Sequence, residues 1–141
     1  MLQVKRNGVN ITGTKREFLN IFQVFNETKD VKNVKYATIN VINSKVIREQ
    51  LDELEAMATP SQEFIDLSIK AQELIKNEDE AGLKRLEEEN TSLVEARKTQ
   101  LAEVQAKLDE EVTLELKMIN EKILPEDLSA EQLEMISKLI N

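Results

Sequence analysis

The chain has 141 residues, a formal net charge of −8, no cysteine and no histidine, and only 4% of its residues are aromatic. This length suits one domain, and the scarcity of aromatic residues favours long helices that meet along aliphatic stripes. The missing cysteine and histidine exclude disulfides, thiolate metal sites and the commonest general base. We therefore expect a protein that is not an enzyme, with no catalytic residue, metal site or cofactor.

Charge is distributed unevenly along the chain. Residues 1–48 hold nine basic and three acidic residues, a net charge of +6, and residues 49–141 hold ten basic and 24 acidic residues, a net charge of −14. The acidic part would repel a phosphate backbone, so we expect no non-specific nucleic-acid binding. The basic part either neutralises acidic helices, within the chain or across a subunit interface, or meets a small anionic ligand.

Two features indicate where the protein resides. No segment approaches the roughly 20 consecutive apolar residues of a membrane span. The first ten residues contain no apolar run of the kind found in signal peptides. We expect a cytoplasmic protein without a membrane partner.

Three segments alternate apolar and polar residues in the manner of β-strands. Residues 2–6 and 9–12 flank Asn7-Gly8, a dipeptide that favours the tight turn of a β-hairpin because both residues tolerate positive φ. A hairpin alone is marginally stable, and residues 112–118 alternate in the same way. We predict a small three-stranded antiparallel sheet that joins the N-terminal hairpin to a strand near 112–118.

Two helices are predicted after the hairpin. Thr14-Lys15-Arg16-Glu17 has the pattern of a capping box, in which the Thr hydroxyl accepts an amide and the Glu carboxylate bonds back. The helix that starts there should end within residues 26–30. A second helix is predicted over residues 31–58. The apolar residues that fit its helical period are Ile47, Leu51, Leu54 and Ala58.

Residues 59–111 predict a long helical hairpin arm. Thr59-Pro60-Ser61-Gln62 combines an N-cap hydroxyl, Pro at the first helical position and Gln at the third. The apolar residues expected to form a buried stripe behind this start are Phe64, Leu67, Ala71, Leu74 and Ile75. A polar reversal over residues 77–80 leads to a fourth helix over about 81–111.

Polar residues interrupt the apolar seam of the fourth predicted helix. Asn90 and Arg97 occupy core-like positions, and such residues fix register and partner number at a cost in stability. The stripes of the arm exceed what the rest of the chain can cover. We therefore expect a homo-oligomer that assembles through contacts of the coiled-coil type.

The chain ends with a further capping box, Ser129-Ala130-Glu131-Gln132, which predicts a short terminal helix. The predicted fold class is mainly α (α+β), in a single domain over residues 1–141. Within it we distinguish a basic hairpin with helices (1–58), the helical hairpin arm (59–111), and a strand with the short terminal helix (112–141).

One stripe on the second predicted helix is a candidate binding site. Lys32, Tyr36, Asn40 and Asn43 are spaced by four, four and three residues and so share one helical face. The ring suits stacking on a base, the amides suit hydrogen-bonding its edges, and nearby cations suit phosphates. The candidate ligand-binding residues are Lys32, Lys35, Tyr36, Asn40, Asn43, Lys45 and Arg48.

The alternative interpretation of this stripe is structural. It also suits an ordinary helix–helix contact in which the Asn side chains are hydrogen-bonded. The other, broader face of the same predicted helix carries the apolar residues Val34, Ala37, Ile39, Val41, Ile42 and Val46.

Three short segments carry a resemblance. They are Val34-Lys35-Tyr36-Ala37 with a downstream Asn and Lys, Pro60-Ser61-Gln62-Glu63-Phe64, and residues 124–133. In these segments the chain resembles small, mostly uncharacterised proteins of tailed bacteriophages that infect Gram-positive bacteria. The resemblance implies an accessory protein that acts by binding in the host bacterial cell: it would block a host protein, sequester a defence signal or assist virion assembly.

These observations lead to one preferred function and two alternatives. We expect a homo-oligomeric counter-defence protein that sequesters a small anionic nucleotide in a pocket lined by the basic N-terminal third. One alternative is a protein–protein interaction module without a small-molecule ligand, such as an assembly chaperone or scaffold. Another is a host-enzyme inhibitor whose acidic segment mimics nucleic acid. The first needs converging basic and aromatic groups, the second an exposed apolar patch, and the third clustered carboxylates.

Overall fold

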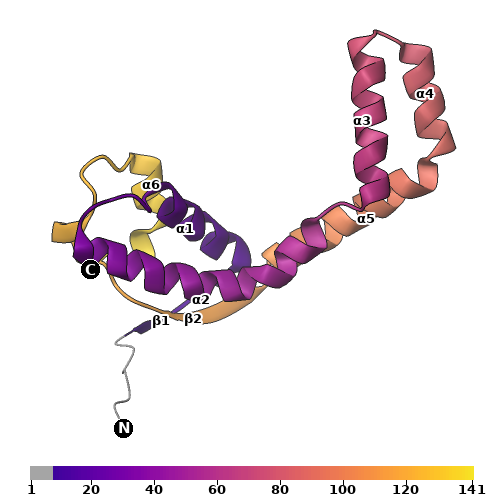
Figure 1. Ribbon diagram of the computed structural model, residues 1–141. Helices are drawn as coiled ribbons and strands as arrows, with labels where there is room; N and C mark the ends of the chain where they lie inside the picture. Colours follow the sequence, from indigo (N-terminus) through magenta and orange to yellow (C-terminus); the bar gives the residue numbers. More distant parts are fainter. Residues whose placement is uncertain (1–7) are drawn as a thin grey trace. The chain divides into compact units, whose positions relative to one another are not determined.

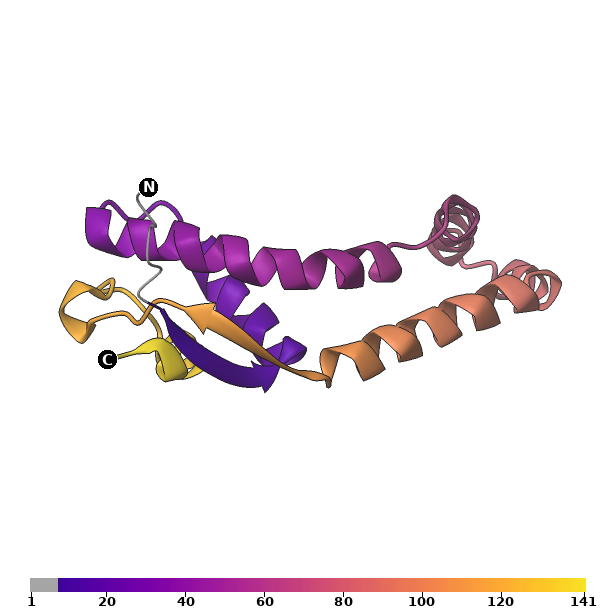
Figure 2. The same ribbon diagram turned by 90° about the horizontal axis from the view of Figure 1, so that it is seen from below.

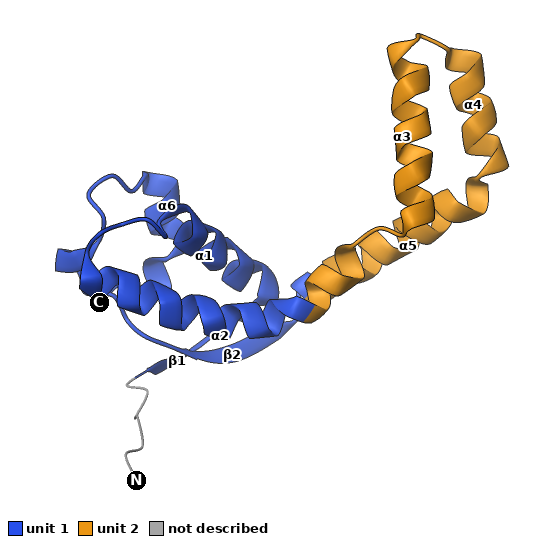
Figure 3. Cartoon of the chain, viewed as in Figure 1, with its two compact units in different colours: residues 1–52, 108–141 blue, residues 53–107 orange. Residues whose placement is uncertain are grey.

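The computed structural model describes residues 8–141, which form two compact units (Figures 1 and 3). The first unit comprises the chain up to Asp52 together with residues 108–141, and the second comprises residues 53–107. The protein is mainly helical with a small antiparallel sheet, as predicted. Among the described residues, no helix has the length and apolar character to cross a membrane.

The sheet of the first unit joins the two ends of the chain. Strand β1 (Val9–Thr14) pairs antiparallel with β2 (Glu111–Leu116) (Figure 2). In this pairing Val9 lies opposite Leu116. This pairing confirms the predicted strand near 112–118. The remaining predicted strand, over residues 2–6, and Asn7 of the predicted turn lie outside the described residues, and the sheet within residues 8–141 has two strands.

Helix α1 (Lys15–Glu27) starts where the capping pattern predicts. The Thr14 hydroxyl accepts a hydrogen bond from the Glu17 main-chain N–H at 3.1 Å. The Glu17 carboxylate also makes a longer-range contact, because Lys138 Nζ donates to it at 2.6 Å. This hydrogen bond holds the pKa of Glu17 below its ordinary value and links the start of α1 to the C-terminal segment.

Helix α2 (Val34–Ala58) confirms the second predicted helix but begins three residues later than expected. Asn33 Oδ1 accepts hydrogen bonds from the main-chain N–H groups of Lys35 and Tyr36, at 3.0 and 3.2 Å. Asn33 therefore satisfies two amides that the first turn of a helix leaves without intrahelical partners, and so sets its start.

The C-terminal segment completes the first unit. It contains the 3-10 turns η1 (Glu121–Ile123) and η2 (Ser137–Leu139) and helix α6 (Ala130–Met135), whose capping box at Ser129 forms in full, as predicted. The core of the unit draws on α1, α2, β2 and this segment. Its fully buried or nearly buried apolar residues are Phe18, Ile21, Val24, Phe25, Tyr36, Ile47, Leu114, Leu116, Ile119, Ile136 and Leu139.

The second unit contains α3 (Gln62–Lys76), α4 (Glu80–Glu89) and most of α5 (Thr91–Leu108). Ser61, not Thr59, is the N-cap of α3, and its hydroxyl accepts from the Phe64 N–H at 3.2 Å. Thr59 belongs to the end of α2, because its hydroxyl donates to the Glu55 carbonyl at 2.8 Å. The helix therefore starts two residues later than the sequence pattern predicts.

The prediction of one continuous fourth helix over 81–111 is wrong. The chain reverses after α3 as expected, but the following helix breaks at Asn90, so that α4 runs beside α3 while α5 takes another direction (Figures 1 and 2). The Asn90 side chain donates to the Leu86 carbonyl at 2.8 Å, and Thr91 Oγ1 donates to the Glu88 carbonyl at 3.1 Å. Such side-chain bonds compete with the helical ladder.

Arg97 also has a role other than interrupting a seam. Its guanidinium donates to the Ala58 carbonyl at 2.9 Å and to Gln100 Oε1 at 2.8 Å. Gln100 Nε2 in turn donates to the Thr59 carbonyl at 3.1 Å and to the Met57 carbonyl. The two side chains therefore satisfy carbonyls that the end of α2 leaves without intrahelical partners.

Candidate functional site

The polar stripe predicted as a ligand site lies on the buried face of α2. Tyr36 and Asn43 have no exposed surface, and Asn40 is 6% exposed. The Tyr36 ring therefore has no free face on which a base could stack in this structure. Every buried polar side-chain atom within residues 8–141 has a hydrogen-bond partner, which is the arrangement that the structural alternative describes.

Tyr36 and Asn40 close the C-terminal end of α1. Thr28 caps this end by donating its hydroxyl to the Val24 carbonyl at 2.8 Å, and the Tyr36 hydroxyl lies 2.8 Å from the same Thr28 oxygen. The Asn40 amide donates to the Phe25 carbonyl, also at 2.8 Å. Burial raises the pKa of Tyr36, and the hydrogen bond with Thr28 offsets part of that rise.

Asn43 ties α2 to the sheet. Its amide donates to the Lys117 carbonyl at 2.9 Å, and its oxygen accepts from the Lys117 N–H at 2.8 Å. Lys117 follows β2 directly, so the Asn43 side chain supplies the donor and acceptor that a neighbouring strand would offer. This amide is used inside the protein to hold the end of β2 against α2.

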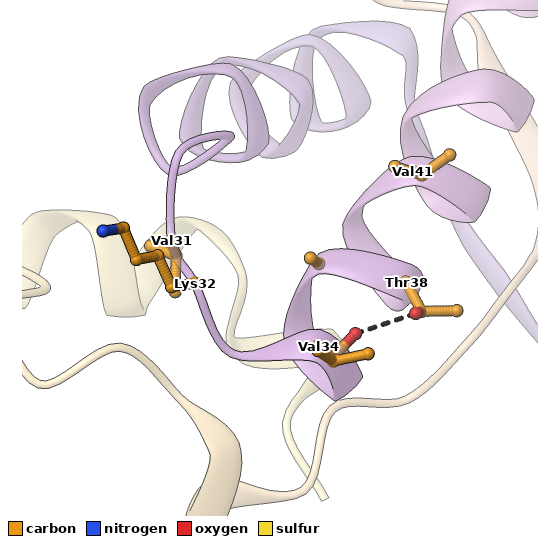
Figure 4. A pocket seen from close by; sticks show the side chains of 6 residues that line it. Val31, Lys32, Val34, Thr38 and Val41 are labelled. Carbon is orange, nitrogen blue, oxygen red and sulfur yellow. Dashed lines mark hydrogen bonds between the residues drawn. The ribbon is translucent and has the colours of Figure 1, made fainter.

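The apolar face of α2, opposite the polar stripe, is partly exposed. Val34 and Val41 are 78% and 69% exposed, because the helix turns its tyrosine and asparagines inward. These valines line an open hollow of about 550 Å³. Figure 4 shows Lys32 at its edge, with the amine extending away from Val34 and Thr38. Thr38 donates to the Val34 carbonyl at 2.7 Å, so its hydroxyl is already bonded.

The structure does not bring the seven candidate ligand-binding residues together. Lys32, Lys35, Lys45 and Arg48 are exposed, whereas the three uncharged members are buried. Of the exposed four, Lys45 and Arg48 line a second hollow, of about 320 Å³, which α1 and α2 form between them. We call this feature the basic hollow. Its other lining residues include Phe22, Lys29, Val41 and Ser44.

Sequence reasoning missed two contributors to the basic hollow. Lys29 follows α1, on a different element from Lys45, so no local spacing connects the two. Phe22 of α1 is only partly buried, and the Arg48 guanidinium lies 5.5 Å from its ring centroid. The run of basic residues over 28–48 was the only available signal for this grouping.

A second candidate surface lies on the helical arm. Neither α3 nor α4 contains a buried residue, so the stripe predicted as buried in α3 is only partly covered. Ile75 of that stripe is 61% exposed, and Ile69, on another face of α3, is 51% exposed. Leu101 of α5 is 42% exposed. Within the second unit only Leu54 and Val104 are buried apolar residues.

No group of three or more Asp or Glu side chains within residues 8–141 is placed to hold a metal ion. Comparisons with protein-family models, with curated protein sequences and with solved structures returned no match. The structure offers two candidate surfaces, the helical arm and the basic hollow.

Proposed function

We propose that the protein is a non-enzymatic interaction module that self-associates through its helical arm. The observation that carries this proposal is that α3 and α4 form a helical hairpin without one buried residue. An amphipathic hairpin gains stability by covering its apolar side chains, and here the chain itself covers them only in part. A second copy of the chain, packed on the face of α3 that carries Ile69, would cover exposed apolar surface there.

The charges of α3 favour a second copy as the partner. The first half of the helix, residues 62–69, carries two acidic residues and no basic residue, and residues 70–76 carry two Lys and one Glu. An antiparallel pairing of α3 with its copy places the acidic half of each against the basic half of the other. Ile69 lies at the middle of the helix and would meet its own copy at the two-fold axis.

This contact predicts an oligomer that depends on Ile69. Ile69→Lys removes a half-exposed apolar side chain from both copies, a loss of about 2 kcal/mol in association free energy from burial alone, which is roughly a thirtyfold increase in the dissociation constant. Because Ile69 is 51% exposed, the folded monomer should tolerate the change. Size-exclusion chromatography with light scattering, over a concentration series, measures the shift toward the 16.2 kDa monomer.

A matched control separates the contact from a general effect of charge. Thr99→Lys adds the same charge to an exposed position of α5 in the same unit and should leave the oligomer unchanged. A wild-type mass of 16.2 kDa at about 100 μM would refute self-association. An oligomer that persists undiminished in Ile69→Lys would place the contact elsewhere than on α3.

A further inference from the structure

The basic hollow combines an apolar floor with a cationic rim. Phe22 of α1 and Val41 of α2 supply apolar surface, and Lys29, Lys45 and Arg48 surround it. Residues 28–48 contain five basic residues and one acidic residue, so the surroundings of the hollow are positively charged although the whole chain is acidic. Within residues 8–141, none of the three rim cations forms an ion pair with a carboxylate.

Arg48 contacts the Phe22 ring at the rim of the basic hollow. Its guanidinium lies 5.5 Å from the centroid of the Phe22 ring, within the range of a cation–π contact. A guanidinium in such a contact can still donate through the N–H groups along its edge to two oxygens of one phosphate. Lys45 lies three residues earlier on α2 and so on a neighbouring part of the same face.

We propose that the basic hollow binds a small phosphorylated molecule with a flat ring, of the mononucleotide class. The phosphate contacts Arg48, Lys45 and Lys29, and the ring lies against the apolar floor at Phe22 and Val41. The volume of about 320 Å³ is at the lower end of small-molecule sites, which matches one nucleoside and its phosphate. A long nucleic acid is disfavoured because the chain as a whole carries a net charge of −8.

The site differs from the stripe that the sequence suggests. The apolar contact moves from the buried Tyr36 to Phe22 and Val41, which line the hollow. Of the amides of α2 only Asn40 lines it, and the Asn40 N–H donates to the Phe25 carbonyl. Ser44 remains at the hollow, and its hydroxyl donates to Asn40 Oδ1 at 3.0 Å, which leaves its oxygen able to accept from the ligand. The site requires no residue of the helical arm and is therefore independent of self-association.

Calorimetric titration of the full-length protein with adenosine 5′-monophosphate tests the proposal. We expect binding that weakens at least severalfold as ionic strength rises, because exposed charges are screened. Adenosine without phosphate and inorganic phosphate without the ring should each bind at least tenfold more weakly. Arg48→Gln and Lys45→Gln should each weaken binding about tenfold, because each removes a charged donor to the phosphate.

A control variant tests whether the loss of binding is specific to the cations of the basic hollow. Lys35→Gln removes an exposed cation from α2 that does not line the basic hollow, and it should leave the dissociation constant within about twofold of the wild type. Circular dichroism should show that all three variants are folded, since each changed side chain is exposed.

Four results would overturn the proposal. The first is no measurable heat at millimolar adenosine 5′-monophosphate, and the second is equal weakening by Lys35→Gln, which would indicate diffuse charge attraction. The third is an affinity for adenosine or for inorganic phosphate equal to that for adenosine 5′-monophosphate. Equal binding of adenosine would show that the cationic rim does not contribute, and equal binding of phosphate would show that the apolar floor does not. The fourth is competition by a glutamate-rich peptide that binds more tightly than the nucleotide, which would assign the hollow to a protein partner.

Discussion

Asn43 should contribute more to stability than any exposed polar residue of α2, although its substitution removes only one small amide. Asn43→Ala removes the donor and the acceptor that the main chain of Lys117 now uses, at 2.9 and 2.8 Å. A buried polar group that loses its partner costs about 1–3 kcal/mol, and water reaches Lys117 in part. We therefore expect a loss of about 2–3 kcal/mol in the free energy of unfolding.

Urea denaturation followed by circular dichroism measures this loss. The midpoint should fall without a change in the denaturant slope, since the surface exposed on unfolding is nearly unchanged. Asn26→Ala is the matched control, because Asn26 is an exposed Asn in α1, and its effect should stay within about 0.5 kcal/mol. If Asn43→Ala lies within the same 0.5 kcal/mol of the wild type, the reasoning about the Lys117 main chain is refuted.

Two further predictions concern protonation. Tyr36 is the only tyrosine, so absorbance at 295 nm reports its ionisation alone, and the pKa should lie above 10 in the folded protein and return to its ordinary value in urea. Because the folded state favours the neutral phenol, stability should fall as pH rises above about 10. In Tyr36→Phe this fall should be smaller. An unshifted titration would contradict the burial of the Tyr36 ring. The pH dependence of stability due to Glu17 has the opposite sign, because Lys138 lowers the pKa of Glu17. Its contribution to the free energy of unfolding is present above the ordinary pKa of 4.5 and is lost as pH falls through the lower pKa of the folded state. Glu17→Gln should reduce stability at pH 7 by less than about 1 kcal/mol, because the Glu17–Lys138 pair is exposed. At pH 2 the same change should leave stability nearly unchanged. Double-mutant cycles with Lys138→Gln at both pH values measure this difference.

Local sequence was sufficient for the starts of several elements. Thr14 and Ser129 cap α1 and α6 through bonds to amides three residues ahead, so short-range spacing reveals them. The predicted strand near 112–118 was also correct. Successive side chains of a strand point to opposite faces, so an alternation of apolar and polar residues can be recognised in the sequence alone. The predicted start of α3 was off by two residues because Thr59 and Ser61 each offer an N-cap hydroxyl, and local spacing does not distinguish between them.

Continuity of a helix was harder to predict. The apolar seam over 81–111 continues in sequence through Asn90, but the structure ends α4 there. An Asn in a seam has two outcomes, a buried polar contact with a partner helix or a bond to its own helical carbonyl, and spacing does not distinguish them. The choice depends on whether a partner helix lies opposite, which is a property of the assembled unit.

The sequence by itself determined which residues of α2 share a face, because the helical period is a local property. Only the tertiary structure decided which face is buried. Tyr36, Asn40 and Asn43 have polar atoms that need partners, and those partners are the end of α1 and a main-chain group 74 residues away. Val34 and Val41 are exposed in consequence, because a helix that turns its amides toward buried main-chain groups must turn the opposite face outward.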